Sequence, residues 1–366
     1  MRAADINAGR EEKPIVSGLG SIIRVEAWGV NVSDLCYLVA DIGATHARFQ
    51  CCELNAQGAP SLLGEPLILS TKDYSAAAAL TAAVNSHWPQ RAYAGALIAV
   101  AGPVDLSTGD VTVLNTGLLL PHGVLENDFG CPVLCVNDFY AQAHAVPYIH
   151  DMLTLLSKSA QADLPAVANA QPKALLGPGS GLGMAALIPE PANQWRVLAS
   201  EGGHADLATG SFLEAELWSV LAQEHTHVCW ETVLSGPGLV NLYRAVSSIW
   251  GSKAEALSPA EISTAGMAMS DPVCHQTLET FAGLLGSAAA NFALTVGARG
   301  GVYLGGGLVA KLSGFLEASP LRRRFDERGD LSAYVQAIPL HLITQPEPGL
   351  LGASYCLASA VRQSSL

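Results

Sequence analysis

Short apolar blocks separated by glycine and proline run through the chain, and they predict an α/β protein. Two of these blocks, in residues 94–104 and 131–139, are continuous and have the length of buried strands. Segments with helical patterning occupy residues 74–88 and 140–149. No block reaches the roughly 20 uninterrupted apolar residues that span a bilayer, so no membrane association is expected.

A strand, a glycine-containing turn and a second strand follow one another twice, in residues 36–54 and again in residues 173–188. Each copy predicts a hairpin whose turn could present backbone N–H groups to a phosphate. The length of 366 residues suggests two domains, so the repetition predicts two similar lobes around a cleft. We place the crossover in the polar, alanine-rich residues 151–172. We interpret the polar and aperiodic residues 1–35 as an N-terminal extension.

Composition narrows the possible partners. The net charge is −13 and only 19 residues are Lys or Arg, which disfavours a nucleic-acid binder. Positive charge for a bound phosphate would have to come from Mg²⁺, backbone N–H groups or helix N-termini. The eight cysteines show neither zinc-site spacing nor a disulfide framework, and the N-terminus lacks an apolar signal core. These features predict free thiols in a reducing cytoplasm.

The two hairpin turns are candidate phosphate sites. In the first, DIGAT from Asp41 to Thr45, the amides and the hydroxyl could meet a phosphate while Asp41 holds Mg²⁺ through water. The second, GPGSGLG from Gly177 to Gly183, has four glycines, which are costly unless the backbone must approach something closely. It has neither the lysine of a Walker A loop nor the Rossmann spacing. For both turns an ordinary hairpin connection remains the alternative.

Polar residues at a strand end form a second kind of candidate site. Asn137 and Asp138 follow a predicted buried strand, where ligand sites of α/β folds occur. Asp138 could accept the proton of an attacking sugar hydroxyl. Asn and Asp before a helix are also typical N-cap residues, so a structural role is the alternative.

Three later motifs complete the candidates. In EGGHADLA, Glu201 and His204 flank two glycines and could both hydrogen-bond sugar hydroxyls; a metal site with Asp206 would lack a third ligand. Glu231 precedes an SGPG turn and a helix. The segment RGGVYLGGGLV, residues 299–309, runs into three glycines, which suit either an adenine or ribose against the backbone or a close-packed strand-to-helix turn.

The order of these motifs resembles the bacterial glucokinase family, from about residue 37 to the C-terminus, and the segment LSGPGLVNLYRA is long and specific. The resemblance implies an actin-like, hexokinase-type (ribonuclease H-like) fold of two α/β lobes. Each lobe would have a five-stranded mixed sheet, and the two would close over a central ligand cleft. The implied domains are 36–148, with the C-terminal helix 349–366 packed back on it, and 149–348.

The resemblance also implies roles for the matched residues, with Asp138 as the catalytic base. The positions that match sugar-binding residues are Asn115, Asn137, Asp138, Glu201, His204 and Glu231. The positions that match nucleotide-binding residues are Asp41, Gly43, Ala44, Thr45, Gly179, Ser180, Gly181, Gly305, Gly306 and Gly307, with Asp41 as a ligand of Mg²⁺ through water.

The implied activity is transfer of the γ-phosphoryl group of ATP to the 6-hydroxyl of glucose or a related hexose, with Mg²⁺, by a cytoplasmic homodimer. Ala44 and His46 depart from the family's usual glycine and asparagine in the first loop. They motivate the alternative of a weakly active or non-catalytic, sugar-binding regulator. A DNA-binding repressor is disfavoured because residues 1–35 are too few and too poorly patterned for a helix-turn-helix domain.

Overall fold

The computed structural model describes residues 36–89, 91–105, 107–155, 170–191, 194–345 and 348–364. The chain divides into two compact units, a smaller one up to Val136 together with Ala353–Leu366, and a larger one from Asn137 to Gly352. The expected N-terminal extension and most of the expected crossover lie outside the described residues.

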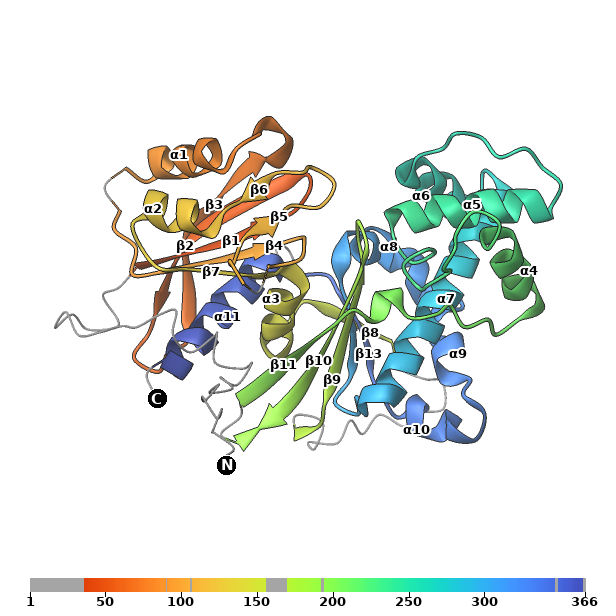
Figure 1. The fold of residues 1–366 in the computed structure, drawn as a ribbon. Coiled ribbons are helices and arrows are strands. Elements are labelled where there is room, and N and C mark those ends of the chain that lie inside the picture. Colours follow the sequence, from red (N-terminus) through yellow and green to blue (C-terminus); the bar gives the residue numbers. More distant parts are fainter. Residues whose placement is uncertain are drawn as a thin grey trace, which may run out of the picture. The chain divides into compact units, whose positions relative to one another are not determined.

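The smaller unit contains a five-stranded sheet of order β3-β2-β1-β4-β7 (Figure 1). Its strands are β1 (Cys36–Ile42), β2 (His46–Leu54), β3 (Pro60–Ser70), β4 (Ala96–Val100) and β7 (Val133–Asn137). The antiparallel pairing of β1 with β2 confirms the first predicted hairpin, and β1 also pairs in parallel with β4. A separate antiparallel pair is formed by β5 (Val111–Thr112) and β6 (Leu119–Leu120).

Helices cover both sides of this sheet. In Figure 1, α1 (Ala77–His87) and α2 (His122–Phe129) lie on one side and α11 (Pro348–Ser364) on the other. Leu80 of α1 and Phe129 of α2 pack in one cluster with sheet residues such as Leu38. On α11, Arg362 donates a hydrogen bond of 3.0 Å to the carbonyl of Gly58.

The larger unit is built on a six-stranded sheet of order β11-β10-β9-β12-β13-β8. Its strands are β8 (Met152–Leu155), β9 (Lys173–Pro178), β10 (Leu182–Glu190), β11 (Gln194–Ser200), β12 (Val302–Leu304) and β13 (Leu340–Ile343). The family resemblance implied five strands. The sixth arises because the short β8 pairs antiparallel with β13 at one edge.

Alternate residues of β9 face two different cores, as expected for a strand buried on both sides. Ala174 and Leu176 join the cluster made with the large helices, whereas Leu175 joins the one made with the helix that follows β7. The helices of this unit are α3 (Asp138–Ala145), α4 (Phe212–Leu221), α5 (Gly236–Ile249), α6 (Pro259–Met267), α7 (Pro272–Val296), α8 (Gly306–Ala318), α9 (Leu321–Asp326) and α10 (Ser332–Gln336).

The unit boundary at Val136 differs from the expected domain limit at residue 148. Ala143 and Ala145 of α3 pack with Leu187 and Val197 of the six-stranded sheet, so α3 belongs with the larger unit. How the functional domains divide the chain stays a prediction. In the part of the chain that the structure describes, no helix combines the length and apolarity that crossing a membrane requires.

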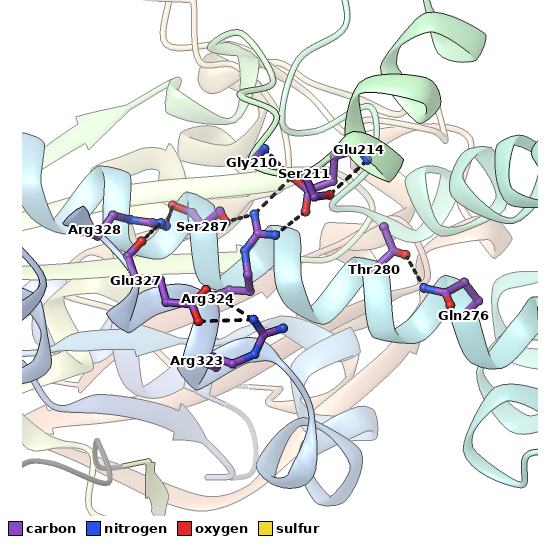
Figure 2. A network of polar contacts seen from close by, with 10 residues as sticks. All are labelled: Gly210, Ser211, Glu214, Gln276, Thr280, Ser287, Arg323, Arg324, Glu327 and Arg328. Atoms are coloured by element: carbon purple, nitrogen blue, oxygen red, sulfur yellow. Dashed lines mark hydrogen bonds and ion pairs between the residues drawn. The ribbon is translucent and has the colours of Figure 1, made fainter.

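A buried network joins three helices of the larger unit (Figure 2). Arg324 of α9 donates to Glu214 of α4 at 2.7 and 3.1 Å, and to the Ser287 hydroxyl of α7 at 2.9 Å. Glu214 also accepts the backbone N–H of Gly210 at 2.6 Å. The side chains of Arg324 and Glu214 are only 14% and 6% exposed, so each charge depends on the other for compensation.

A second buried cluster surrounds His341 of β13. Its ring stacks on Tyr303 with centroids 4.6 Å apart, and Nδ1 lies 2.9 Å from the Thr154 hydroxyl. Lys173 is buried beside it and donates to the Gly300 carbonyl and the Tyr303 hydroxyl. Burial, with a smaller contribution from the charges of Lys173 and Arg322, lowers the pKa of His341 to about 4.

This depressed pKa predicts a pH-dependent stability. Between pH 6.5 and about 4 the unfolded chain binds a proton at residue 341 that the folded chain excludes, so stability falls as the pH falls. The full loss from this group is about 3 kcal/mol. Denaturant unfolding from pH 7 to pH 4 should show a weaker pH dependence in His341→Gln than in the wild type. The exposed His150→Gln variant is the control, and equal slopes for all three proteins would contradict the prediction.

Candidate active site

The candidate base stands where β7 passes into α3. Asn137 caps the helix, because its side-chain oxygen accepts the backbone N–H groups of Phe139 at 2.9 Å and Tyr140 at 3.1 Å. Asp138 is the first residue of α3, and its Oδ1 accepts the same Phe139 N–H at 2.8 Å. The capping alternative is therefore correct for Asn137. It leaves the ligand-binding role possible, since the cap uses the amide oxygen and not the amide nitrogen.

Phe139 connects this helix start to the second glycine hairpin. Gly177 of β9 and Gly183 of β10 are direct cross-strand partners. A Cβ atom on either glycine would overlap the ring of Phe139. The ring thus fills a slot that only glycine leaves open, and it holds the first turn of α3 against the hairpin.

Glu231 is attached to the turn of the same hairpin. The backbone N–H of Leu182 donates to Glu231 Oε2 at 2.7 Å. A Cβ at Gly181 would overlap that carboxylate oxygen, so the glycine permits the hydrogen bond. At the tip, the Gly179 carbonyl accepts the N–H of Gly236, the first residue of α5, at 2.8 Å.

The EGGH segment lies beside Glu231. The backbone N–H of Glu231 donates to the Gly203 carbonyl at 2.8 Å, and His204 Nε2 is 3.8 Å from Glu231 Oε1. A Cβ at Gly203 would overlap the carbonyl oxygen of Leu182, so this segment also requires glycine to pack against β10. Glu201 begins the short 3₁₀ turn Gly202–His204 and is exposed.

The metal alternative for this segment finds no support. Asp206 is paired with His227, whose Nε2 lies 2.8 Å from Asp206 Oδ1, and not with His204. Across the described ranges, no group of three or more His, Cys, Asp or Glu residues could hold a metal ion.

The three glycines after β12 lie against the other side of the hairpin. Gly305 donates its N–H to the Leu176 carbonyl at 2.8 Å. Gly306, the first residue of α8, has φ +85°, and a Cβ there would lie 2.6 Å from the Pro178 carbonyl oxygen. Both the left-handed backbone and the close approach require glycine. The close-packed turn is therefore present, and a role in binding adenosine stays a prediction.

Five of the predicted residues belong to the smaller unit, namely Asp41, Gly43, Ala44, Thr45 and Asn115, while Ser180 at the tip of the hairpin and Gly307 in α8 belong to the larger one. The first loop is a tight turn in which Gly43 N–H donates to the His46 carbonyl at 2.9 Å. Thr71 supports it through its hydroxyl, which donates to the Gly43 carbonyl at 2.7 Å. At the end of β1, Asp41 Oδ2 lies 3.9 Å from Arg48 Nη1. Asn115 is exposed between β5 and β6 with φ 63°, a conformation that asparagine tolerates well.

The structure thus gathers half of the predicted residues around one hairpin of the larger unit. The residues that its contacts connect are Asn137, Asp138, Gly179, Gly181, His204, Glu231, Gly305 and Gly306. Sequence reasoning did not single out Phe139 or Leu182, although both are central to these contacts. The spacing of Gly177 and Gly183 indicated that another group packs closely against the hairpin, but it did not indicate that this group is Phe139.

Gly183→Ala should lower any turnover that depends on the predicted base Asp138 by about 10²-fold, because a small displacement of a catalytic group is costly. The new methyl group would push Phe139, and with it the start of α3, away from the hairpin. The free energy of unfolding should fall by about 1–3 kcal/mol. Steady-state kinetics and denaturant unfolding measure the two effects.

Two further variants control this prediction. Gly314→Ala in α8, where a Cβ would meet no atom within 4 Å, should cost neither activity nor stability. Adding Gly183→Ala to Phe139→Ala should cost little more than Phe139→Ala alone, because the overlapping ring is gone. Wild-type kinetics in Gly183→Ala, or full additivity of the two changes, would contradict the role given to Phe139.

Comparison with known proteins adds an independent line of evidence. A family model described as Glucokinase matches residues 38–360. The glucokinase of Chromobacterium violaceum is 40% identical over 326 residues, which cover 88% of this chain and 89% of that protein. The glucokinase of Nitrobacter hamburgensis is 37% identical over 316 residues, covering 86% and 95%.

Solved structures of glucokinases have a fold similar to that of this chain. A glucokinase from an Antarctic psychrotroph has a TM-score of 0.74 and 34% identity, covering 88% of this chain and 99% of that one. A ROK family glucokinase from Streptomyces griseus, in complex with glucose and AMPPNP, has a TM-score of 0.56 at 19% identity, covering 87% and 98%. The fold likeness confirms the predicted α/β, actin-like class, and the sequence relationships show that the chain belongs to the glucokinase family.

Proposed function

We propose that this protein is an ATP-dependent glucokinase that phosphorylates the 6-hydroxyl of glucose, with Asp138 as the catalytic base. The observation that carries this proposal is the position of Leu182. Its N–H binds Glu231, its carbonyl lies against Gly203, and it follows the glycine turn. Candidate sugar-binding groups and a candidate phosphate turn therefore share one rigid support, as phosphoryl transfer by positioning requires.

The sugar would be held by Asn137, Glu201, His204 and Glu231, and in the smaller unit by Asn115. The carboxylates accept hydrogen bonds from hydroxyls, and the Asn137 amide nitrogen can donate one. The cap fixes the Asn137 side chain, and the Leu182 N–H fixes Glu231. Both groups are therefore oriented before the substrate arrives, which reduces the entropic cost of binding.

Asp138 would act on the 6-hydroxyl. Its carboxylate accepts the hydroxyl proton while the oxygen attacks the γ-phosphorus, and the bond from that phosphorus to the bridging oxygen of ADP breaks. The Phe139 N–H donates to Oδ1, which fixes the orientation of the carboxylate. Because Phe139 packs against Gly177 and Gly183, the start of α3 and its carboxylate are held against the hairpin whose turn would bind phosphate.

ATP would be bound by the two glycine turns and by Gly305–Gly307. The turns offer backbone N–H groups, and Thr45 and Ser180 add hydroxyls. Asp41 is a single, partly buried carboxylate, which fits Mg²⁺ that is otherwise held by phosphates and water. When bound, Mg²⁺ would offset the negative charge of the β- and γ-phosphates.

The first loop also bears on the non-catalytic alternative. Ala44 replaces the family's second glycine, and a positive φ there would have strained an alanine. In the described part of the chain only Asn115 and Met269 have a positive φ among residues other than glycine. Ala44 is therefore not held in the left-handed conformation that favours glycine, which supports an active enzyme.

A coupled assay for ADP formation with glucose and Mg-ATP tests the function directly. We expect turnover by the wild type, and Ala44→Gly should change kcat by no more than a few-fold because Ala44 has no positive φ. Glucose binding without turnover, together with turnover gained in Ala44→Gly, would instead support the sugar-binding regulator. Glucosamine and mannose as acceptors, and ADP and polyphosphate as donors, define the specificity.

Location and assembly are further parts of the proposal. All eight cysteines are free thiols, which supports a reducing cytoplasm. A homodimer is proposed from the family resemblance, and light scattering of the purified protein tests it.

A further inference from the structure

We propose that Cys36 and Cys51 form a peroxide-sensitive thiol pair, in which Cys36 is the reactive sulfur and Cys51 resolves its oxidised form. The pair lies in the smaller unit and is independent of the sugar-binding and phosphate-binding residues described above. Its ligand class is a small hydroperoxide, and its product is an intrachain disulfide.

The pairing register places the two sulfurs on one face of the β1–β2 hairpin. Leu38 lies directly opposite Cys51, and Cys36 is two residues before Leu38, so the two cysteines are diagonal neighbours. The two thiols are close enough to influence each other's pKa, and the Cys36 thiol also contacts the Tyr37 carbonyl oxygen at 3.7 Å. Cys36 is half-buried while Cys51 is fully buried, so a reagent from solution would reach Cys36 first.

Arg91 completes the cluster from outside the sheet. Its Nη1 donates to the Cys36 sulfur at 3.3 Å, and the arginine itself is exposed. A cation and a hydrogen-bond donor at a thiol are the features that create a reactive cysteine. The charge of Glu53, which lies directly opposite Cys36 in the register, opposes them.

The pKa values of the two thiols are shifted in opposite directions. Interaction with the Cys51 thiol and the contact with Arg91 lower the pKa of Cys36 to about 6, against the opposing effect of burial. Interaction with the Cys36 thiol and burial raise the pKa of Cys51. At neutral pH Cys36 is therefore the thiolate, and Cys51 keeps its proton.

The other cysteines do not share this environment. Cys52 follows Cys51 and so points to the opposite face of the strand. Burial raises the pKa values of Cys52, Cys131, Cys135 and Cys356 to about 12. Among the eight thiols, Cys36 is the one that is not buried.

The proposed reaction proceeds in two steps. The Cys36 thiolate attacks one oxygen of hydrogen peroxide, the O–O bond breaks, and hydroxide leaves, which takes up a proton to become water. The Cys51 thiol then loses its proton and attacks the sulfur of the Cys36 sulfenic acid, and a second water leaves. Two thiols are oxidised by two electrons in total, and one peroxide is reduced to two waters.

Peptide mass mapping of the full-length, reduced protein tests the proposal. Iodoacetamide at pH 7 should alkylate Cys36 roughly tenfold faster than any other cysteine. One equivalent of hydrogen peroxide should give a Cys36–Cys51 disulfide that dithiothreitol reverses. In Cys51→Ala, dimedone should instead trap a sulfenic acid at Cys36.

Matched variants distinguish specific oxidation of this pair from nonspecific oxidation of the other cysteines. Arg91→Gln should slow the alkylation of Cys36 several-fold, and because Arg91 is exposed this variant tests the proposal even where a core variant folds poorly. Cys52→Ala should leave the disulfide unchanged. Alkylation of Cys36 no faster than that of the buried thiols, a disulfide to Cys52, or no effect of Arg91→Gln would overturn the proposal.

Discussion

Asp138→Asn should lower kcat for glucose phosphorylation by roughly 10³-fold, while the Kd for glucose changes by only a few-fold. The amide has nearly the same shape, and its oxygen can still accept the Phe139 N–H that Asp138 Oδ1 accepts at 2.8 Å. It cannot take up a proton, so the variant removes the function of a base and keeps the hydrogen bond at the start of α3. The coupled assay gives kcat, and calorimetric titration with glucose gives the Kd.

A second helix of the larger unit offers a matched control. Asp271 caps α7 through a hydrogen bond of 2.8 Å from the Cys274 N–H. Asparagine is an equally good cap, so Asp271→Asn should leave kinetics and stability unchanged. Wild-type kcat in Asp138→Asn would remove Asp138 as the base. A collapse of glucose binding along with kcat would make its role structural.

Periodicity and turn residues were enough to predict the central strands and both glycine hairpins. The apolar runs before Gly43 and before Gly177 have strand length, and glycine follows each of them. The sixth strand of the larger sheet was not predicted. Met152–Leu155 is only four residues long, and its pairing with β13 depends on a partner far away in the sequence.

The site was predictable as a set of residue types but not as a set of contacts. At Asn137 the sequence left a cap and a ligand role as alternatives, and the structure shows that capping occupies only part of the side chain. For Gly177, Gly181 and Gly183, composition indicated close approach. Only the fold could show that the approaching groups are Phe139 and Glu231, because those contacts join residues far apart in the chain.

The chemistry of the smaller unit was the hardest part to predict from the sequence. Ala44 looked like an obstacle in the first loop because the residue type alone does not give the backbone angle. The observed turn takes no positive φ at that position, so the alanine is not in the left-handed conformation that favours glycine. Similarly, the spacing of Cys36 and Cys51 had no meaning until the strand register placed them on one face.

Arg324→Met should lower the free energy of unfolding of the larger unit by about 3–5 kcal/mol, because it leaves a buried carboxylate without its cation. The Glu214 carboxylate is 6% exposed, and of its contacts drawn in Figure 2 it would keep only the one with the Gly210 N–H. Equilibrium unfolding in urea, followed by circular dichroism, measures the loss.

The adjacent arginine is the natural control for this network. Arg323 also pairs with a glutamate, Glu327, at 3.3 Å, but both side chains are more than half exposed. Arg323→Met should therefore cost no more than about 1 kcal/mol. The contrast between two neighbouring arginines on α9 tests burial as the cause, since residue type, helix and substitution are the same.

The double variant Arg324→Met with Glu214→Leu decides between the two ways a buried ion pair can act. If the pair mainly compensates its own desolvation, replacing both charges should restore most of the stability that Arg324→Met removes. If the double variant stays as unstable as the single one, the pair also holds α4, α7 and α9 in place through Ser287 and Gly210. We expect restoration to within about 1–2 kcal/mol of the wild type, because an apolar pair of similar volume can fill the same space.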